Sequence, residues 1–363
     1  MHHVRCSVVN DQHRSRRNGF LLLGPLREIL LISLFAAIVL AVIFYANAIR
    51  WLETSAAESQ AMASRQEPVQ RLDYDSDRNS VLVQAWNGQF EEISLGDRGV
   101  VKKAMPPHFA SFEASETNST IVMQSLWAEQ SQLYESVNIV RGDELLVTEE
   151  FLIEVHASAD VRISRNGAIA LFVRHEGVIV GWGLESTETT RWEYRLKFSP
   201  TTTSLSPDGN RLFVASREGT TFVCDSHTGE IQLSLPDIIS CSRHATWSSD
   251  NRCIAVSNIY GMTLIFDAKT GEIVGQIKNE LLFARVLKFS PDGRYLAVGG
   301  FDRTIRIWDW AQSDGKPQLL FGSSAQIGSF VFTESGSKLV AGCADGTIRE
   351  WSLQTNEMTR QIR

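Results

Sequence analysis

The chain repeats itself about every 42 residues over most of its length. Steps of 42, 42, 42 and 43 residues separate the five clearest turns, Asn166-Gly167, Asp208-Gly209, Asp250-Asn251, Asp292-Gly293 and Ser335-Gly336. Two weaker copies turn at Arg78-Asn79 and Asn118-Ser119, which gives seven units between about Val69 and Arg363. Because one such unit cannot bury its own apolar face, the units must stack on one another to form a single body.

Each unit reads as four short strands separated by turn residues, which is typical of an all-β fold. In the fourth unit the strands are expected over 201–206, 211–216, 220–226 and 230–235. Its second strand contains the apolar run Leu212-Phe213-Val214-Ala215, typical of a strand covered on both faces. A four-stranded unit of about 40–45 residues has the period of a propeller blade. The sequence therefore predicts a seven-bladed propeller of four-stranded blades over residues 69–363.

Residues 203–353 resemble the WD-repeat family, and residues 69–200 match it by pattern only. The motifs are S-P-D-G at 206–209 and 290–293, T-I-R-I-W-D at 304–309 and D-G-T-I-R-E-W at 345–351. The resemblance implies a seven-bladed propeller that acts as an interaction platform. It also implies structural roles for the residues that match the family's loop Asp, Ser/Thr and Trp, namely Asp302, Thr304, Trp308, Asp345, Thr347 and Trp351.

The sequence departs from the family at the Gly-His pair, which is absent. The sixth unit has Asn279-Glu280 in that place and the seventh has Gly322-Ser323. We therefore expect apolar packing to dominate over polar locking between blades. The four strands of each unit come in order, so closing the ring requires no strand exchange between the termini.

A membrane segment is expected before the repeats. Ile29–Ala48 has no charge over 20 residues, about the length that spans a bilayer as a helix. More arginines lie close to the N-terminal side of the segment than to its C-terminal side. Those before it are Arg14, Arg16, Arg17 and Arg27, and those after it are Arg50 and Arg65. By the positive-inside rule the N-terminus stays cytoplasmic and the propeller lies outside.

The predicted organisation is a basic cytoplasmic leader over 1–28, a transmembrane signal anchor over 29–48, a linker over 49–68 and the propeller. Two alternatives remain open for the location. Cleavage after Ala46-Asn47-Ala48 would make a secreted or periplasmic protein, and reversed topology would make a cytoplasmic scaffold.

Charge argues against a nucleic-acid partner. Residues 1–50 carry a net charge of +4, so the remainder carries −11 of the chain's total of −7. An acidic body repels a phosphate backbone.

No catalytic, cofactor or metal site is predicted, and we expect no enzymatic activity. Asp73-x-Asp75-x-Asp77 opens like a calcium loop, but Arg78 and Gln84 stand where that loop needs Gly and Glu. A polar-faced strand that runs into a turn is the better interpretation. The histidines have no metal-ligand spacing, and no G-x-S-x-G occurs.

A partner is expected to bind where the turns between second and third strands gather at one mouth of the ring. These turns carry aromatic and basic residues, which interface centres favour: Trp86, Trp127, His175, Arg217, Tyr260, Phe301 and Arg303. The predicted function is a platform for a protein or peptide of unknown identity. The alternative is a propeller enzyme or small-ligand sensor with a site over the central channel, and individual side chains could instead pack against neighbouring blades.

Overall fold

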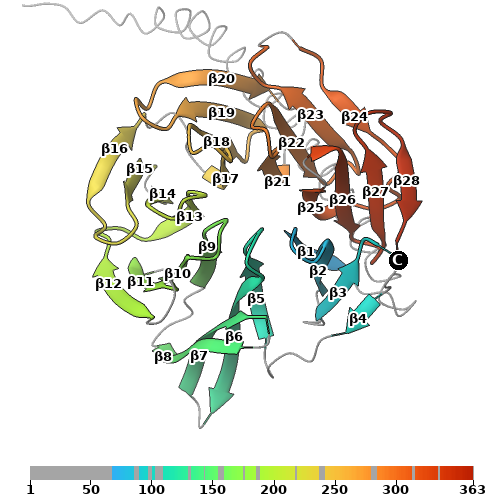
Figure 1. Cartoon of the computed structure of the whole chain (residues 1–363). Coiled ribbons are helices and arrows are strands. Elements are labelled where there is room, and N and C mark those ends of the chain that lie inside the picture. The colour runs from blue at the N-terminus through green and yellow to red at the C-terminus, as the bar shows by residue number, and fades with distance from the viewer. Residues whose placement is uncertain are drawn as a thin grey trace, which may run out of the picture. The chain divides into compact units, whose positions relative to one another are not determined.

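The described residues form seven antiparallel four-stranded sheets arranged in a ring (Figure 1). This computed structural model describes residues 68–362 except 86–89, 97–99, 103–108, 130–131, 143, 154–158, 175, 185–188, 217–218, 237–241, 279–283, 313–314 and 334–335. They belong to one compact unit, Ala57–Arg363. In every sheet the strands follow in chain order, so the prediction of an all-β, seven-bladed propeller is confirmed.

The first four blades contain the strands β1 to β16. They are β1 (Val69–Asp75), β2 (Ser80–Ala85), β3 (Phe90–Ser94), β4 (Val100–Lys102), β5 (Phe109–Ala114), β6 (Thr120–Glu129), β7 (Gln132–Arg141), β8 (Glu144–Ile153), β9 (Ala159–Ile163), β10 (Ile169–Arg174), β11 (Val178–Gly183), β12 (Thr190–Arg195), β13 (Pro200–Leu205), β14 (Arg211–Ser216), β15 (Thr221–Asp225) and β16 (Ile231–Leu235).

The last three blades contain the remaining strands. They are β17 (Ser242–Trp247), β18 (Cys253–Asn258), β19 (Met262–Asp267), β20 (Ile273–Lys278), β21 (Ala284–Phe289), β22 (Tyr295–Gly300), β23 (Ile305–Asp309), β24 (Gln318–Leu320), β25 (Ile327–Thr333), β26 (Lys338–Cys343), β27 (Ile348–Ser352) and β28 (Met358–Gln361).

The apolar core lies between neighbouring blades. Phe213 and Val223 of the fourth blade pack with Trp247 and Ile254 of the fifth, and the other clusters join blades in the same way. The second strand of a blade is covered by a blade on each side, so Leu212 and the four residues that follow it in β14 are all buried. This explains why these strands read as continuous apolar runs rather than as alternating ones.

The ring closes by packing the first blade directly on the seventh. β1 lies against β25 and β26, and no strand is exchanged between the ends of the propeller. The contact needs glycine, because a Cβ on Gly328 would collide with the backbone oxygen of Val69. A Cβ on Gly342 would collide with the Val69 side chain.

The turns between first and second strands surround one opening of the ring, which we call the ab mouth, and they are bonded from blade to blade. The Ser76 N–H and hydroxyl both donate to the Glu116 carbonyl, at 2.9 and 2.6 Å. The Thr117 N–H donates to the Arg165 carbonyl at 3.2 Å, and the Arg165 N–H donates to the Pro207 carbonyl at 3.0 Å. Polar locking, which the missing Gly-His pair argued against, is therefore present here and accompanies the apolar packing.

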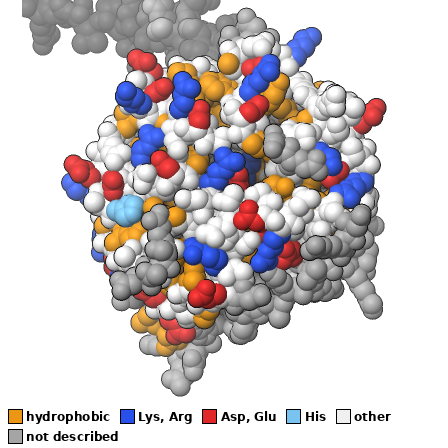
Figure 2. Space-filling view, viewed as in Figure 1, with side chains coloured by type: hydrophobic (Ala, Val, Ile, Leu, Met, Phe, Trp, Pro, Cys, Tyr) orange, Lys and Arg blue, Asp and Glu red, His pale blue; other side chains and the backbone are white. Residues whose placement is uncertain are grey.

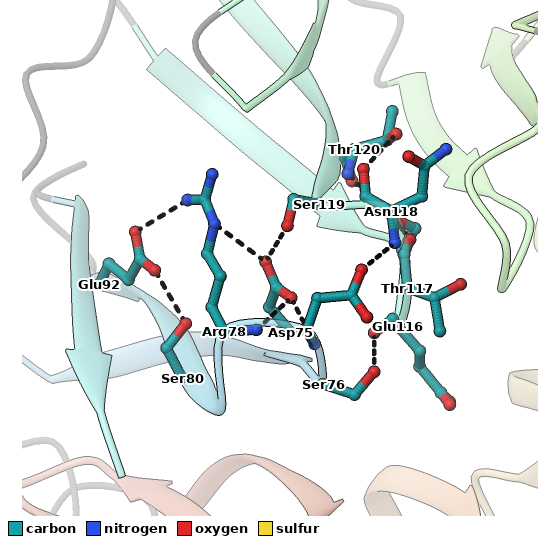
Figure 3. A network of polar contacts seen from close by, with 12 residues as sticks. Asp75, Ser76, Arg78, Ser80, Glu92, Glu116, Thr117, Asn118, Ser119 and Thr120 are labelled. Carbon is teal, nitrogen blue, oxygen red and sulfur yellow. Dashed lines mark hydrogen bonds and ion pairs between the residues drawn. The ribbon is translucent and has the colours of Figure 1, made fainter. Parts of the chain in front are cut away.

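Asp75 caps its own turn and also accepts a hydrogen bond from the second blade (Figure 3). Its carboxylate accepts the N–H groups of Asp77 and Arg78 at 3.0 and 3.2 Å, and the Ser119 hydroxyl of the second blade at 2.9 Å. The strand β1 thus ends in a capped turn, as the polar-strand interpretation expected. In the described part of the chain, no group of three or more His, Cys, Asp or Glu residues could hold a metal ion.

The second blade is longer than the others. Its strands β6, β7 and β8 have ten residues each, and β6 continues for four residues beyond Ser125, where its pairing with β5 ends. The extension projects from the ring in Figure 1. Arg174 of the third blade braces it, because its guanidinium lies 5.7 Å from the Phe151 ring centre and donates to the Leu152 carbonyl at 3.2 Å.

The predicted leader, the anchor and the linker up to residue 67 lie outside the described residues. Within the part of the chain that the structure describes, no helix is long and apolar enough to cross a bilayer.

Candidate interaction site at the bc mouth

The turns between second and third strands surround the other opening of the ring, which we call the bc mouth. Three of the residues predicted to bind a partner are described there with their side chains. Tyr260 is 63% exposed, Phe301 is 40% exposed, and Arg303 is exposed as well. Tyr260 lies in the turn of the fifth blade, and Phe301 and Arg303 share the turn of the sixth.

The other predicted residues are placed differently. Trp86, His175 and Arg217 lie outside the described residues. Trp127 does not lie in a turn, as predicted, but within β6, where its backbone pairs with Tyr134 of β7. The prediction failed because the repeat period places the turn of an average blade at this point, whereas the strands of the second blade continue beyond it.

The turn of the sixth blade has an unusual backbone. In the third, fourth, fifth and seventh blades, one turn residue has φ of +86°, +92°, +79° and +77°, and it is always glycine: Gly177, Gly219, Gly261 and Gly346. In the sixth blade the same position is Arg303, with φ of +67°. A non-glycine residue rarely adopts this left-handed conformation, because its Cβ crowds the backbone.

Two further arginines lie beside the turns of these blades, Arg285 at the turn of the sixth blade and Arg243 at the turn of the fifth. Arg243 and Arg285 sit at corresponding positions in β17 and β21, at an irregularity near the start of each innermost strand. There Ala284 pairs with Gly300, directly before Phe301. The Arg285 guanidinium lies over the Phe301 ring, 5.9 Å from its centre, which is cation–π range. Arg243 is exposed.

His244 lies near these arginines and is affected by their charges. Burial lowers the pKa of His244 to about 4, and the positive charges of Arg243, Arg285 and Arg162 lower it further, while Asp160 opposes them. The imidazole is therefore neutral at neutral pH. Three arginines therefore lie close enough to His244 to disfavour its charged form, although the chain as a whole is acidic.

The loop aspartates with an implied structural role cap their own turns. Asp302 accepts the Thr304 N–H at 3.2 Å and pairs with Arg306 at 2.5 Å. Both aspartates pair with the arginine four residues further on, and both accept the N–H two residues further on. In the seventh blade these partners are Arg349, at 3.1 Å, and Thr347, at 3.0 Å, around Asp345.

The two matching tryptophans have unequal environments. Trp351 is completely buried, and its indole N–H donates to the Phe321 carbonyl at 2.7 Å. Trp308 is partly buried, and its indole nitrogen finds no hydrogen-bond acceptor among the described residues. The neighbouring Trp310 instead donates to the Gly293 carbonyl at 2.8 Å. In the seventh blade Trp351 both packs in the core and donates a hydrogen bond. In the sixth blade Trp308 packs without an acceptor in the described part of the chain, and Trp310 donates the hydrogen bond.

A central channel of about 1020 Å³ runs inside the innermost strands. Its charges form ion pairs between blades: Arg71 lies 3.5 Å and Arg162 3.6 Å from Glu113, and Lys288 lies 3.9 Å from Asp73. Figure 2 shows basic and acidic side chains close together near the centre of the ring. This arrangement can hold blades in register, and it also presents charged groups to a molecule in the channel.

Sequence reasoning missed Arg243, Arg285 and His244. The two arginines are 42 residues apart, so the repeat period itself could have shown that they occupy equivalent places. The same period aligns Arg303 with Gly261, one blade earlier. That exchange of glycine for arginine was the signal that the sequence contained.

Comparison with known families agrees with this architecture. The WD40 family (WD domain, G-beta repeat) matches residues 284–309 and 315–352, which cover most of the last two blades. A comparison with curated proteins finds no significant match. The molecule is a seven-bladed propeller, and its C-terminal blades are similar to WD40 repeats, a fold that generally serves as a scaffold for protein interactions.

Proposed function

We propose that this chain is a membrane-anchored, extracytoplasmic platform that binds a protein or peptide at the bc mouth, without enzymatic activity of its own. The observation that carries the binding site is the exposure of Tyr260 and Phe301 beside Arg303. Turns usually carry polar residues, and interface centres are enriched in aromatic residues and arginine.

The two mouths differ in how much of their polar surface is already used. At the ab mouth, the N–H groups of Ser76, Thr117 and Arg165 already donate hydrogen bonds to carbonyls of the next blade. At the bc mouth, the two blades that carry Tyr260 and Phe301 present large side chains to solvent. Desolvating these side chains against a partner gains free energy, whereas the three donors named at the ab mouth are already bonded.

Support for the membrane anchor comes from the sequence. Ile29–Ala48 is apolar and uncharged over 20 residues, and the arginines before it outnumber those after it. Protease added to intact cells or spheroplasts should therefore digest the propeller. Protection until lysis would contradict the extracytoplasmic location, and a mature N-terminus at Ile49 would show that the segment is cleaved.

The second candidate function is a ligand sensor or enzyme that uses the channel. The charged residues around its 1020 Å³ favour this reading. We prefer the platform because Asp73, Glu113 and Asp160 each have an arginine or lysine partner from the innermost strands. Glu113 links blades through Arg71 and Arg162, and Asp73 links blades through Lys288, whereas Asp160 pairs with Arg162 of its own strand.

Partner binding is tested with the intact protein. Proximity labelling in cells identifies candidate partners, and the affinity of each is then measured for the wild type and for the double variant Phe301→Ala, Arg303→Ala. We expect weaker binding with a melting temperature within a few degrees of the wild type. If the variant instead unfolds and its binding defect follows the unfolded fraction, Phe301 supports the sixth blade rather than the partner.

A further inference from the structure

We propose that the bc mouth recognises an acidic segment of its partner, whose carboxylates lie between Arg243, Arg285 and Arg303 while an apolar side chain packs on Phe301 and Tyr260. This inference rests on the proposed function, because it assigns a chemistry to the partner at the same mouth. We call these five residues the basic-aromatic sector.

The first argument is the choice of residue at position 303. Four other blades place glycine in the left-handed position of this turn, with φ between +77° and +92°. Arginine costs free energy there, since a left-handed conformation is unfavourable for any residue with a Cβ. No ion pair within the described part of the chain offsets this free energy, because no carboxylate there lies within ion-pair distance of Arg303.

The second argument is charge. Arg243 also has no carboxylate within ion-pair distance among the described residues, whereas Asp302, in the same turn as Arg303, is already paired with Arg306. Among the described residues, Arg243 and Arg303 are therefore two cations without a carboxylate partner, in a chain whose net charge is −7. An acidic ligand supplies the missing charge, and electrostatic complementarity of this kind gives specificity and a high association rate.

The third argument is a comparison of equivalent turn positions. The position before the left-handed residue is acidic in four blades: Glu176, Glu218, Asp302 and Asp345. In the fifth blade it is Tyr260, so the side chain facing the sector from that blade is aromatic rather than negative. Both exchanges, Tyr for an acid and Arg for glycine, fall in adjacent blades and change the local charge in the same direction.

An acidic protein segment fits the sector better than the other polyanions. The remainder of the chain after residue 50 has a net charge of −11, which repels the long phosphate backbone of a nucleic acid. A short segment contacts only the sector and avoids that repulsion. The exposed rings of Tyr260 and Phe301 also offer apolar area that alternating acidic and apolar residues use well.

The test is selection from a displayed library of random dodecapeptides, with the full-length protein in detergent as the target. We expect the enriched peptides to be acidic and to contain an apolar residue. Arg303→Gly should weaken their binding by about 30-fold, the size of a typical hot-spot effect. The melting temperature should stay unchanged or rise, because glycine relieves the left-handed residue.

The matched control is Arg252→Ala, which removes an exposed arginine at the ab mouth and should leave binding unchanged. Enriched peptides that are neutral or basic, and that cross-link to a photoreactive phenylalanine analogue placed at position 260, would overturn the acidic assignment and leave the proposed function standing. Peptides that bind Arg303→Gly as well as the wild type would overturn it too. Tighter binding of a dT12 oligonucleotide or of phosphatidylserine vesicles, lost in Arg303→Gly, would assign the sector to a different polyanion. Peptides that bind only away from the bc mouth would contradict both proposals.

Discussion

A buried carboxyl in the long second blade predicts a measurable dependence of stability on pH. Glu135 of β7 is completely buried and accepts a hydrogen bond from the Gln124 side-chain amide. Its second oxygen has no hydrogen-bond partner among the described residues. Burial raises the pKa of Glu135 from 4.5 to about 7, against the opposing effects of the Gln124 hydrogen bond and of Arg174, while Glu176 adds to the rise.

The magnitude follows from the two pKa values. Above pH 4.5 the unfolded chain loses this proton, whereas the folded chain keeps it up to about pH 7. The contribution of Glu135 to the free energy of unfolding is thus fully present below pH 4.5, and it is lost as the pH rises towards 7. The free energy of unfolding falls by about 1.4 kcal/mol for each pH unit in that window, or about 3 kcal/mol in total.

The substitution Glu135→Gln keeps an acceptor for Gln124 and removes the ionisation. We expect the variant and the wild type to have similar stabilities near pH 4.5, and the variant to be more stable by about 2–3 kcal/mol at pH 8. Urea unfolding of the full-length protein at several pH values measures this difference. Glu150→Gln, on an exposed position of β8, is the control. Equal pH dependence of the wild type and Glu135→Gln would refute the reasoning.

Three further predictions concern the ring and its mouth. Trp351→Ala should destabilise the protein by about 3–5 kcal/mol, and Trp308→Ala should cost less because Trp308 is only partly buried; thermal unfolding of both variants decides. Gly328→Ala should destabilise the closure of the ring through collision with Val69, which hydrogen exchange would show as lost protection in β1 and β25; unchanged exchange would contradict the closure. Since the pKa of His244 is lowered, the contribution of His244 to stability should fall as the pH drops from 6.5 towards 4, opposite in sign to that of Glu135; acid unfolding curves of His244→Gln should therefore show a larger gain of stability on acidification than those of the wild type.

The blades could be predicted from the sequence because each turn follows the last by a nearly constant step. Turn chemistry such as Asp208-Gly209 and Asp292-Gly293 is local, so it survives in the sequence as a readable pattern. The step from Ser119 to Gly167 is 48 rather than 42 residues, and the structure places extra length in β6, β7 and β8. The sequence showed that residues were added without showing which strand or turn received them.

The charges of the channel and of the basic-aromatic sector could not be predicted in the same way. Lys288 and Asp73 meet only because the ring closes, and more than 200 residues separate them in the chain. Arg285 contacts Phe301 because β21 pairs with β22 and the register of this pairing shifts at Arg285. Local propensity does not reveal such a shift. Exposure is also a property of the assembled ring, and it distinguishes Tyr260 from buried aromatic residues such as Phe213.

The central claim is that a partner binds at the bc mouth, and site-specific photocross-linking in living cells tests it most directly. A photoreactive phenylalanine analogue is placed at Tyr260, which is 63% exposed at the bc mouth, or at Arg252, whose side chain is 82% exposed at the ab mouth. We predict a discrete cross-linked partner from position 260 that is lost when Arg303→Gly is added, and none from position 252. Cross-links from position 252 alone, or equally from both mouths, would contradict the account.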